Sequence, residues 1–116
     1  MIKRTFPQTR LRRTRTKSFL RDLIADNNLN TDDLIQPIFI ADQSEDKIEI
    51  PSMPGIHRHN LDSLYLEVEA LTQLGIKSIA IFPAIDAGKK DKDGSYALDE
   101  GNIVCLALTG LAERFP

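Results

Sequence analysis

Three lysines crowd into one polar segment and could supply an amine nucleophile: Lys89, Lys90 and Lys92. A lysine amine reacts only when burial or a neighbouring cation lowers its pKa and releases the free base. Asp91 and Asp93 alternate with these lysines, and carboxylates together with water keep an ammonium group charged. We therefore interpret the lysines as solvated loop charges and assign no catalytic residue to this chain.

Two histidines, His57 and His59, are spaced so that both imidazoles could lie on one side of an extended segment. Zinc needs further ligands, and no cysteine or other histidine stands near them in the sequence. We interpret them as a loop pair without metal. The run from Asp91 to Gly94 is similar to the start of a calcium loop but lacks the later acidic ligands, so it predicts a turn. No metal ligand is assigned.

The single cysteine, Cys105, stands in an apolar stretch, and we expect it to be a buried small hydrophobe. One cysteine excludes an internal disulfide framework. No apolar run approaches the roughly 18 residues of a membrane span, and the first residues lack the apolar core of a secretory signal. We therefore expect a cytoplasmic protein with no membrane partner.

Positive charge is concentrated near the N-terminus. Residues 1–21 hold eight basic side chains and no acidic one, whereas the rest holds 15 − 8 = 7 basic and 17 acidic side chains, about −10 in net charge. Such an arm can bind nucleic acid, an anionic surface or an acidic patch on another copy. No aromatic residue between Phe6 and Phe19 is available to stack on bases, which disfavours nucleic acid.

The elements that must position these side chains begin after an extended arm, residues 1–15, which lacks apolar periodicity. A helix is expected from Thr16, because four apolar residues fall on one face. These are Phe19, Leu20, Leu23 and Ile24. Residues 34–40 predict a buried strand, in which Pro37 indicates a strand end, a bulge or an edge, since it donates no hydrogen bond.

A second β/α pattern follows a possible short strand at residues 48–50 and a turn-rich loop. Asn60 is a suitable N-cap and Gly75 a suitable left-handed C-cap for the helix between them. Its expected inward residues are Leu61, Leu64, Val68, Leu71 and Leu74. Residues 78–82 lack alternation, which predicts a parallel strand covered on both faces and ended by Pro83.

A polar loop, residues 86–99, leads to a last helix that begins near Asn102. Its expected inward residues are Ile103, Leu106, Ala107, Gly110 and Leu111. From residue 34 the order is β-α-β-α, which is typical of a parallel α/β protein. A (β/α)₈ barrel needs about 250 residues and eight strands, and two credible barrel strands occur here.

Several ordered segments carry a resemblance that runs from about residue 10 to residue 116. They are Arg10–Arg15, Asp33–Ile40, Met53-Pro54-Gly55, Leu74-Gly75-Ile76, Ile81-Phe82-Pro83, Lys90–Ser95 and Phe115-Pro116. Together they resemble the N-terminal third of the δ-aminolevulinic acid dehydratases, also called porphobilinogen synthases. Residues 84–88 and 96–98 depart from the family pattern, which leaves the path of that loop open.

The resemblance implies an α/β fold: an extended basic arm, residues 1–15, and a partial TIM-barrel segment, residues 16–116, with the first two β/α units. The family is a lyase that condenses two 5-aminolevulinate molecules to porphobilinogen in haem biosynthesis, through two Schiff-base lysines on later strands. No lysine here matches them, so we expect the chain alone to be inactive.

Zinc or magnesium is implied for the complete enzyme, with no cofactor within this chain. The arm is implied to clasp other copies, giving a homo-octamer when complete.

One substrate-binding residue is named, Phe82. Active sites of (β/α)₈ barrels gather at the C-terminal ends of the strands, and Phe82 closes the run 79–82 just before Pro83. The resemblance places it at a family phenylalanine that lines the substrate pocket. The alternative is a barrel-core aromatic beneath the pocket.

Two other functions stay open. The first is a stand-alone binding module that uses the basic arm on nucleic acid or an acidic protein. The second is a truncated, non-catalytic relative with a scaffold role.

Overall fold

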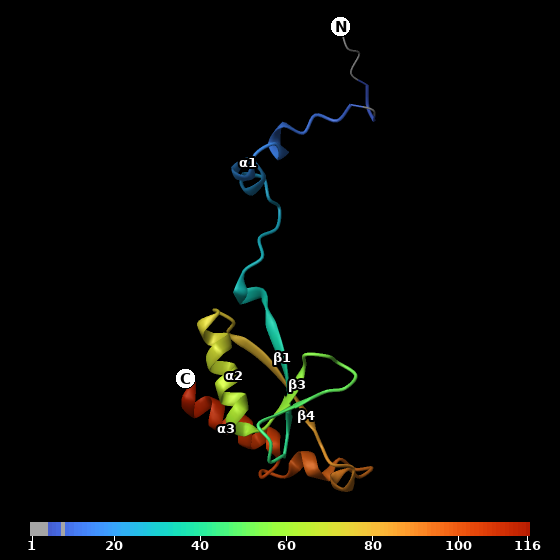
Figure 1. Ribbon diagram of the computed structural model, residues 1–116, viewed down its shortest axis with the longest axis vertical. Helices are drawn as coiled ribbons and strands as arrows, with labels where there is room; N and C mark the ends of the chain where they lie inside the picture. Colours follow the sequence, from blue (N-terminus) through green and yellow to red (C-terminus); the bar gives the residue numbers. More distant parts are fainter. Residues whose placement is uncertain (1–4, 8) are drawn as a thin grey trace.

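A long N-terminal arm leads into a body made of one sheet and two helices (Figure 1). The computed structural model describes residues 5–7 and 9–116, and its principal extents are 78 × 32 × 26 Å. Residues 1–4 and 8 of the predicted arm lie outside the described residues. No helix of the described part is both long and apolar enough to cross a bilayer.

The arm ends in a 3₁₀ turn, η1 (Arg13–Arg15), and the short helix α1 (Ser18–Leu23) follows it. The helix predicted from Thr16 is thus confirmed, two residues later. Its apolar side chains find no core in this chain, since Phe19 is 60% exposed and Leu23 is 77% exposed. Figure 1 places α1 with the arm, away from the sheet. The division of the chain at residue 15 stays a prediction.

The sheet has four strands in the order β2-β3-β1-β4. They are β1 (Ile35–Ala41), β2 (Lys47–Glu49), β3 (His57–His59) and β4 (Ser78–Ala84). Strand β1 pairs in parallel with β4 over its whole length and with β3 at two positions, whereas β2 and β3 are antiparallel. The predicted parallel β-α-β unit is confirmed. Strand β3 was interpreted as loop, because its three polar residues give no strand signal.

Two prolines lie inside strands, at edge positions where the backbone N–H that proline lacks is not needed for strand pairing. Pro37 pairs with Ala80 of β4, while β3 pairs with β1 only at Phe39 and Ile40, so β1 is locally an edge at this proline. Pro83 was expected to end its strand, and this is wrong. It pairs with Ile40, and β4 continues to Ala84, which an outer strand of the sheet tolerates.

Helix α2 (Leu61–Gln73) connects β3 to β4 and supplies one half of the core. Leu64, Val68 and Leu71 are buried as predicted. Leu74 is 69% exposed, which corrects the prediction, because it is the C-cap residue and lies past the last helical turn. Gly75 follows with φ of 83°, the left-handed conformation expected of it.

Helix α3 (Ile103–Arg114) follows a loop that holds the 3₁₀ turns η3 (Ala87–Lys89) and η4 (Ser95–Leu98). Ile103, Ala107 and Leu111 are buried, as predicted. Leu106, also expected inward, is 48% exposed. It faces a cleft instead of the core.

Both helices cover the same face of the sheet (Figure 1). Ile38 and Ile40 of β1 are buried there, and Ile79 and Ile81 of β4 pack against them. No described residue range covers the other face with a helix, and Phe82 on that face is 48% exposed. The prediction that residues 78–82 are covered on both faces is therefore wrong for the chain as it stands.

Candidate functional site

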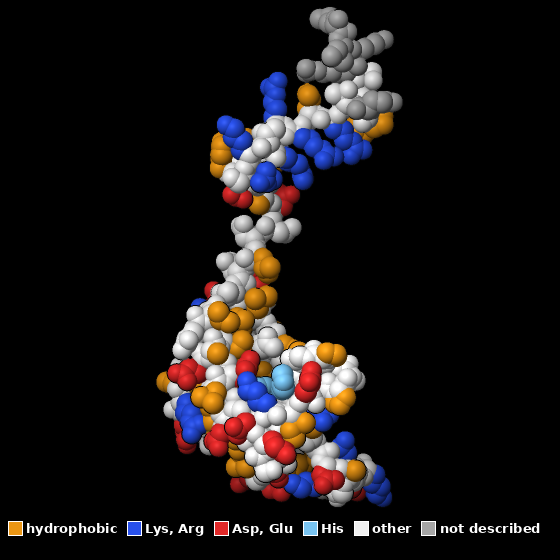
Figure 2. Space-filling model, in the orientation of Figure 1, with side chains coloured by type: hydrophobic (Ala, Val, Ile, Leu, Met, Phe, Trp, Pro, Cys, Tyr) orange, Lys and Arg blue, Asp and Glu red, His pale blue; other side chains and the backbone are white. Residues whose placement is uncertain are grey.

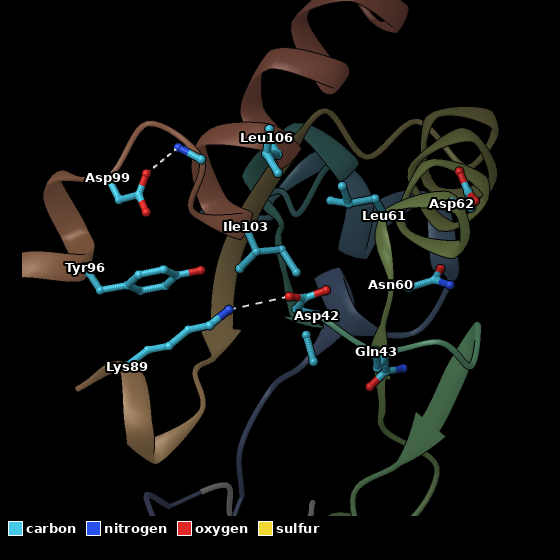
Figure 3. A pocket seen from close by; sticks show the side chains of 12 residues that line it. Asp42, Gln43, Asn60, Leu61, Asp62, Lys89, Tyr96, Asp99, Ile103 and Leu106 are labelled. Carbon is cyan, nitrogen blue, oxygen red and sulfur yellow. Dashed lines mark hydrogen bonds and ion pairs between the residues drawn. The ribbon is translucent and has the colours of Figure 1, made fainter.

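A cleft of about 570 Å³ opens at the carboxyl end of β1, beside the N-termini of α2 and α3. Its lining comes from the end of β1, the start of α2 and the loop that precedes α3 (Figure 3). The lining side chains that the figure labels are Asp42, Gln43, Asn60, Leu61, Asp62, Lys89, Tyr96, Asp99, Ile103 and Leu106. In parallel α/β sheets, ligands bind at this edge of the sheet.

Lys89 and Asp42 meet across the cleft, and Figure 3 shows their side chains pointing toward each other. Lys89 Nζ lies 3.5 Å from Asp42 Oδ2 and 5.2 Å from the centre of the Tyr96 ring. Tyr96, and after it Asp42, raise the pKa of Lys89. The amine therefore stays protonated at neutral pH, which suits binding of an anion or a carboxylate and not nucleophilic attack.

Polar side chains cap the turn and the two helices that position the residues of the cleft. Asp86 Oδ1 accepts a hydrogen bond from the Gly88 amide at 3.1 Å and starts η3, which carries Lys89. Asn102 Oδ1 accepts from the Val104 and Cys105 amides, both at 2.9 Å, and starts α3. Asn60 Oδ1 accepts from the Ser63 amide at 2.9 Å. The sequence predicted Asn60 as a cap and the start of the last helix near Asn102.

Phe82, the one predicted site residue, does not line this cleft. Its Cα partner across the sheet is Phe39, and the two ring centres are 5.7 Å apart on the face that the helices leave open. It lies two residues before the end of β4 and not at the end. Its role in substrate binding stays a prediction.

The two histidines lie on β3 and not in a loop. His59 is buried and contacts Ser63, whereas His57 is half-buried. Asp91 forms the predicted turn, since its Oδ1 accepts from the amides of Asp93 and Ser95, both at 3.0 Å. The hydrogen bonds from Ser95, followed by those from Asp93 and Gly94, lower the pKa of Asp91.

Cys105 is half-buried and lines a small apolar pocket, so the expectation of full burial is only partly met. Within residues 5–7 and 9–116, no three His, Cys, Asp or Glu side chains gather in a group that could hold a metal ion.

Sequence reasoning missed Asp42 and Tyr96 as members of the cleft. The place of Asp42 in the cleft could have been predicted, because this residue directly follows an apolar parallel strand and so lies at the carboxyl edge of the sheet. No feature of the sequence predicts the place of Tyr96, since its position depends on the path of a loop with two 3₁₀ turns.

The parallel strands, the covering helices and the cleft at the carboxyl edge define a segment of a mixed α/β protein. A sequence profile described as Delta-aminolevulinic acid dehydratase matches residues 8–116. The chain belongs to this family.

Individual relatives agree with the profile. The chain is 39% identical over 107 residues to a delta-aminolevulinic acid dehydratase of Chlamydia pneumoniae, covering 92% of this chain and 32% of that protein. It is 42% identical over 109 residues to that of Methanothermus sociabilis, covering 94% and 33%. The chain thus spans about a third of the length of these curated relatives.

A solved structure is similar over nearly the same range. It is the delta-aminolevulinic acid dehydratase (porphobilinogen synthase) of Toxoplasma gondii ME49 in complex with the reaction product porphobilinogen. The TM-score is 0.86 at 33% identity, and the match covers 94% of this chain and 31% of that one.

Proposed function

We propose that this chain is the N-terminal segment of a porphobilinogen synthase, which condenses two molecules of 5-aminolevulinate to porphobilinogen in haem biosynthesis. The observation that carries the proposal is the structural match to the Toxoplasma gondii enzyme over 94% of the chain. Strands β1 and β4 are then the first two strands of a (β/α)₈ barrel, and α2 and α3 are its first two outer helices.

The open face of the sheet supports this placement. In a barrel, side chains on the inner face are covered by strands from around the ring. Phe39 and Phe82 lie on the face without helices, and within the described residues β4 is the last strand of the sheet, so both the face and the edge are in place for further strands.

Phe82 is proposed to form part of the apolar wall of the substrate pocket. An apolar wall beside a lysine disfavours the ammonium form, because a charged group loses hydration there, and so lowers the pKa of the amine. The Schiff-base lysines would belong to later strands, and the zinc or magnesium ion of the complete enzyme is placed outside this chain.

The basic arm is proposed to bind other copies of the protein. Helix α1, which directly follows the arm, presents exposed apolar side chains, and basic residues surround it (Figure 2). The charge of about −10 on residues 22–116 offers a complementary partner surface. A homo-octamer of complete subunits is the assembly that we propose.

The test is a chimaera in which this chain is joined after Pro116 to the remaining part of the Methanothermus sociabilis relative. We expect the purified chimaera to form porphobilinogen from 5-aminolevulinate. The matched control is the same relative joined to this chain with residues 35–41 scrambled, which removes β1. A folded chimaera that makes no porphobilinogen contradicts the proposal.

A further inference from the structure

His59 lies where three strands meet. It is the Cα partner of Lys47 on β2 and of Ile40 on β1, and it is only 6% exposed. Its side chain is on the face of the sheet that packs against α2, because it contacts Ser63 in the first turn of that helix. A titratable ring is thus buried at the open end of the β2–β3 hairpin, where β1, β2 and β3 are paired side by side.

The hydrogen bonds around His59 fix its tautomer. Ser63 Oγ has one proton and donates it to the carbonyl oxygen of Asp46, which can only accept. The contact of 3.1 Å between His59 Nδ1 and Ser63 Oγ must therefore use a proton on Nδ1. A proton taken up on acidification can only go to Nε2, and it creates a buried cation.

The charged groups that face this ring come from each neighbouring element. On β2, Lys47 lies directly opposite, and its Nζ is paired with Glu67 Oε2 of α2 at 3.4 Å. On β3, His57 is on the same side, with Glu49 as its partner on β2, while Arg58 points to the other face. Strand β1 carries no charged residue.

Burial, and after it the positive charge of Lys47, lower the pKa of His59, while Glu67 opposes them. The neutral ring is therefore the form that the fold favours. Glu67 is already paired with Lys47, so an imidazolium here would share one carboxylate with a second cation.

We propose that the protonation state of His59 controls whether residues 42–59 stay packed against α2. The neutral ring holds the β2–β3 hairpin against the helix, and the protonated ring releases it. The His59 imidazole binds a second proton less readily in the folded chain than in the unfolded chain. Stability from this site is therefore complete above the unfolded pKa of about 6.5 and is lost as the pH falls through the folded value.

The consequence reaches the cleft. Residues 42–59 include Asp42 and Gln43, which line it, and Gln43 Nε2 donates to the Arg58 carbonyl at 3.1 Å. The Asp46 carbonyl also accepts from the Asn60 amide at 3.1 Å, at the start of α2. Loosening the hairpin thus loosens one wall of the cleft, whatever reaction the complete protein performs.

The test is amide hydrogen exchange of the 116-residue chain between pH 5 and 8, read by mass spectrometry and corrected for the intrinsic pH dependence of exchange. We expect residues 47–59 to lose protection as the pH falls, by about tenfold for each unit by which the pKa of His59 lies below its unfolded value. Protection of residues 35–41 and 78–84 should stay constant. Uniform loss in all strands would overturn the proposal.

Charge variants decide whether His59 is the group responsible. Lys47→Gln should move the midpoint of the loss to higher pH, and Glu67→Gln should move it to lower pH, because each removes one charge facing the ring. Both side chains are partly exposed, so both variants should fold. His59→Gln should abolish the pH dependence and His57→Gln should retain it. Equal midpoints in the two charge variants would overturn the proposal.

Discussion

Phe39 and Phe82 are direct partners across the parallel strands β1 and β4, with ring centres 5.7 Å apart and ring planes inclined by 36°. Such a tilted pair contributes about 0.5–1.5 kcal/mol beyond the burial of its area. The pair lies on the face without helices, so it joins the first two strands of the proposed barrel from the inside.

Phe82→Leu in the chimaera tests the proposed role of this ring. Leucine keeps an apolar side chain but removes the aromatic wall. We expect porphobilinogen formation to fall by roughly tenfold, equivalent to about 1.4 kcal/mol of transition-state stabilisation. Phe39→Leu is the matched control, because it breaks the same aromatic pair. If both variants lose the same stability and Phe82→Leu keeps its activity, Phe82 is a core residue and not a pocket residue.

Gly110 on α3 lies against Tyr65 on α2, and the contact leaves no room for a side chain. A Cβ atom at Gly110 would come within 2.7 Å of Tyr65 Cζ and closer still to its hydroxyl oxygen. The face of the Tyr65 ring also contacts Arg114, whose guanidinium carbon lies 3.9 Å from the ring centre.

We expect Gly110→Ala to destabilise the chimaera by about 1–3 kcal/mol, although alanine favours helix formation by up to about 1 kcal/mol. Chemical denaturation measures the change. Gly88→Ala is the control, since its nearest contact would be 3.9 Å away. An unchanged midpoint for Gly110→Ala would show that the two helices do not pack this closely.

The sequence predicted most elements of the body because each has a local cause. Asn60 and Asn102 cap α2 and α3 through side-chain oxygens, and Gly75 takes the left-handed conformation after α2. These are properties of single positions and their neighbours, so the sequence carries them.

The errors occurred where distant contacts decide the structure. Strand β3 exists because its backbone pairs with both β1 and β2, and its sequence His-Arg-His has no apolar signal. Pro83 stays in β4 because the strand lies at the edge of the sheet, which the local sequence cannot reveal. The cleft was missed for the same reason, since Lys89 and Asp42 are 47 positions apart and meet only through the parallel sheet.

The isolated chain should associate with itself. In the part of the chain that the structure describes, strand β4 is paired on one side only and the face that carries Phe39 and Phe82 is open, and such surfaces favour pairing between chains. Light scattering should report oligomers or aggregates instead of a single monomer. A sharp monomeric peak with cooperative unfolding would count against this account of the open face.

Deletion of residues 1–15 should reduce the oligomer size of the chimaera and leave the secondary structure of its barrel largely intact. The described part of this segment has no buried residue, so the body does not depend on it. Sedimentation measures the size and circular dichroism the secondary structure. The same oligomer before and after the deletion would contradict the proposed role of the arm.

The most direct test of the central claim is a side-by-side assay of the isolated chain and the chimaera with 5-aminolevulinate. We expect the family's Schiff-base lysines to lie on later strands, outside this chain, and loss of a covalent nucleophile removes most of an enzyme's rate. We predict porphobilinogen from the chimaera and none above buffer from the isolated chain. Turnover by the isolated chain that survives further purification would contradict the claim that the activity belongs to the complete barrel.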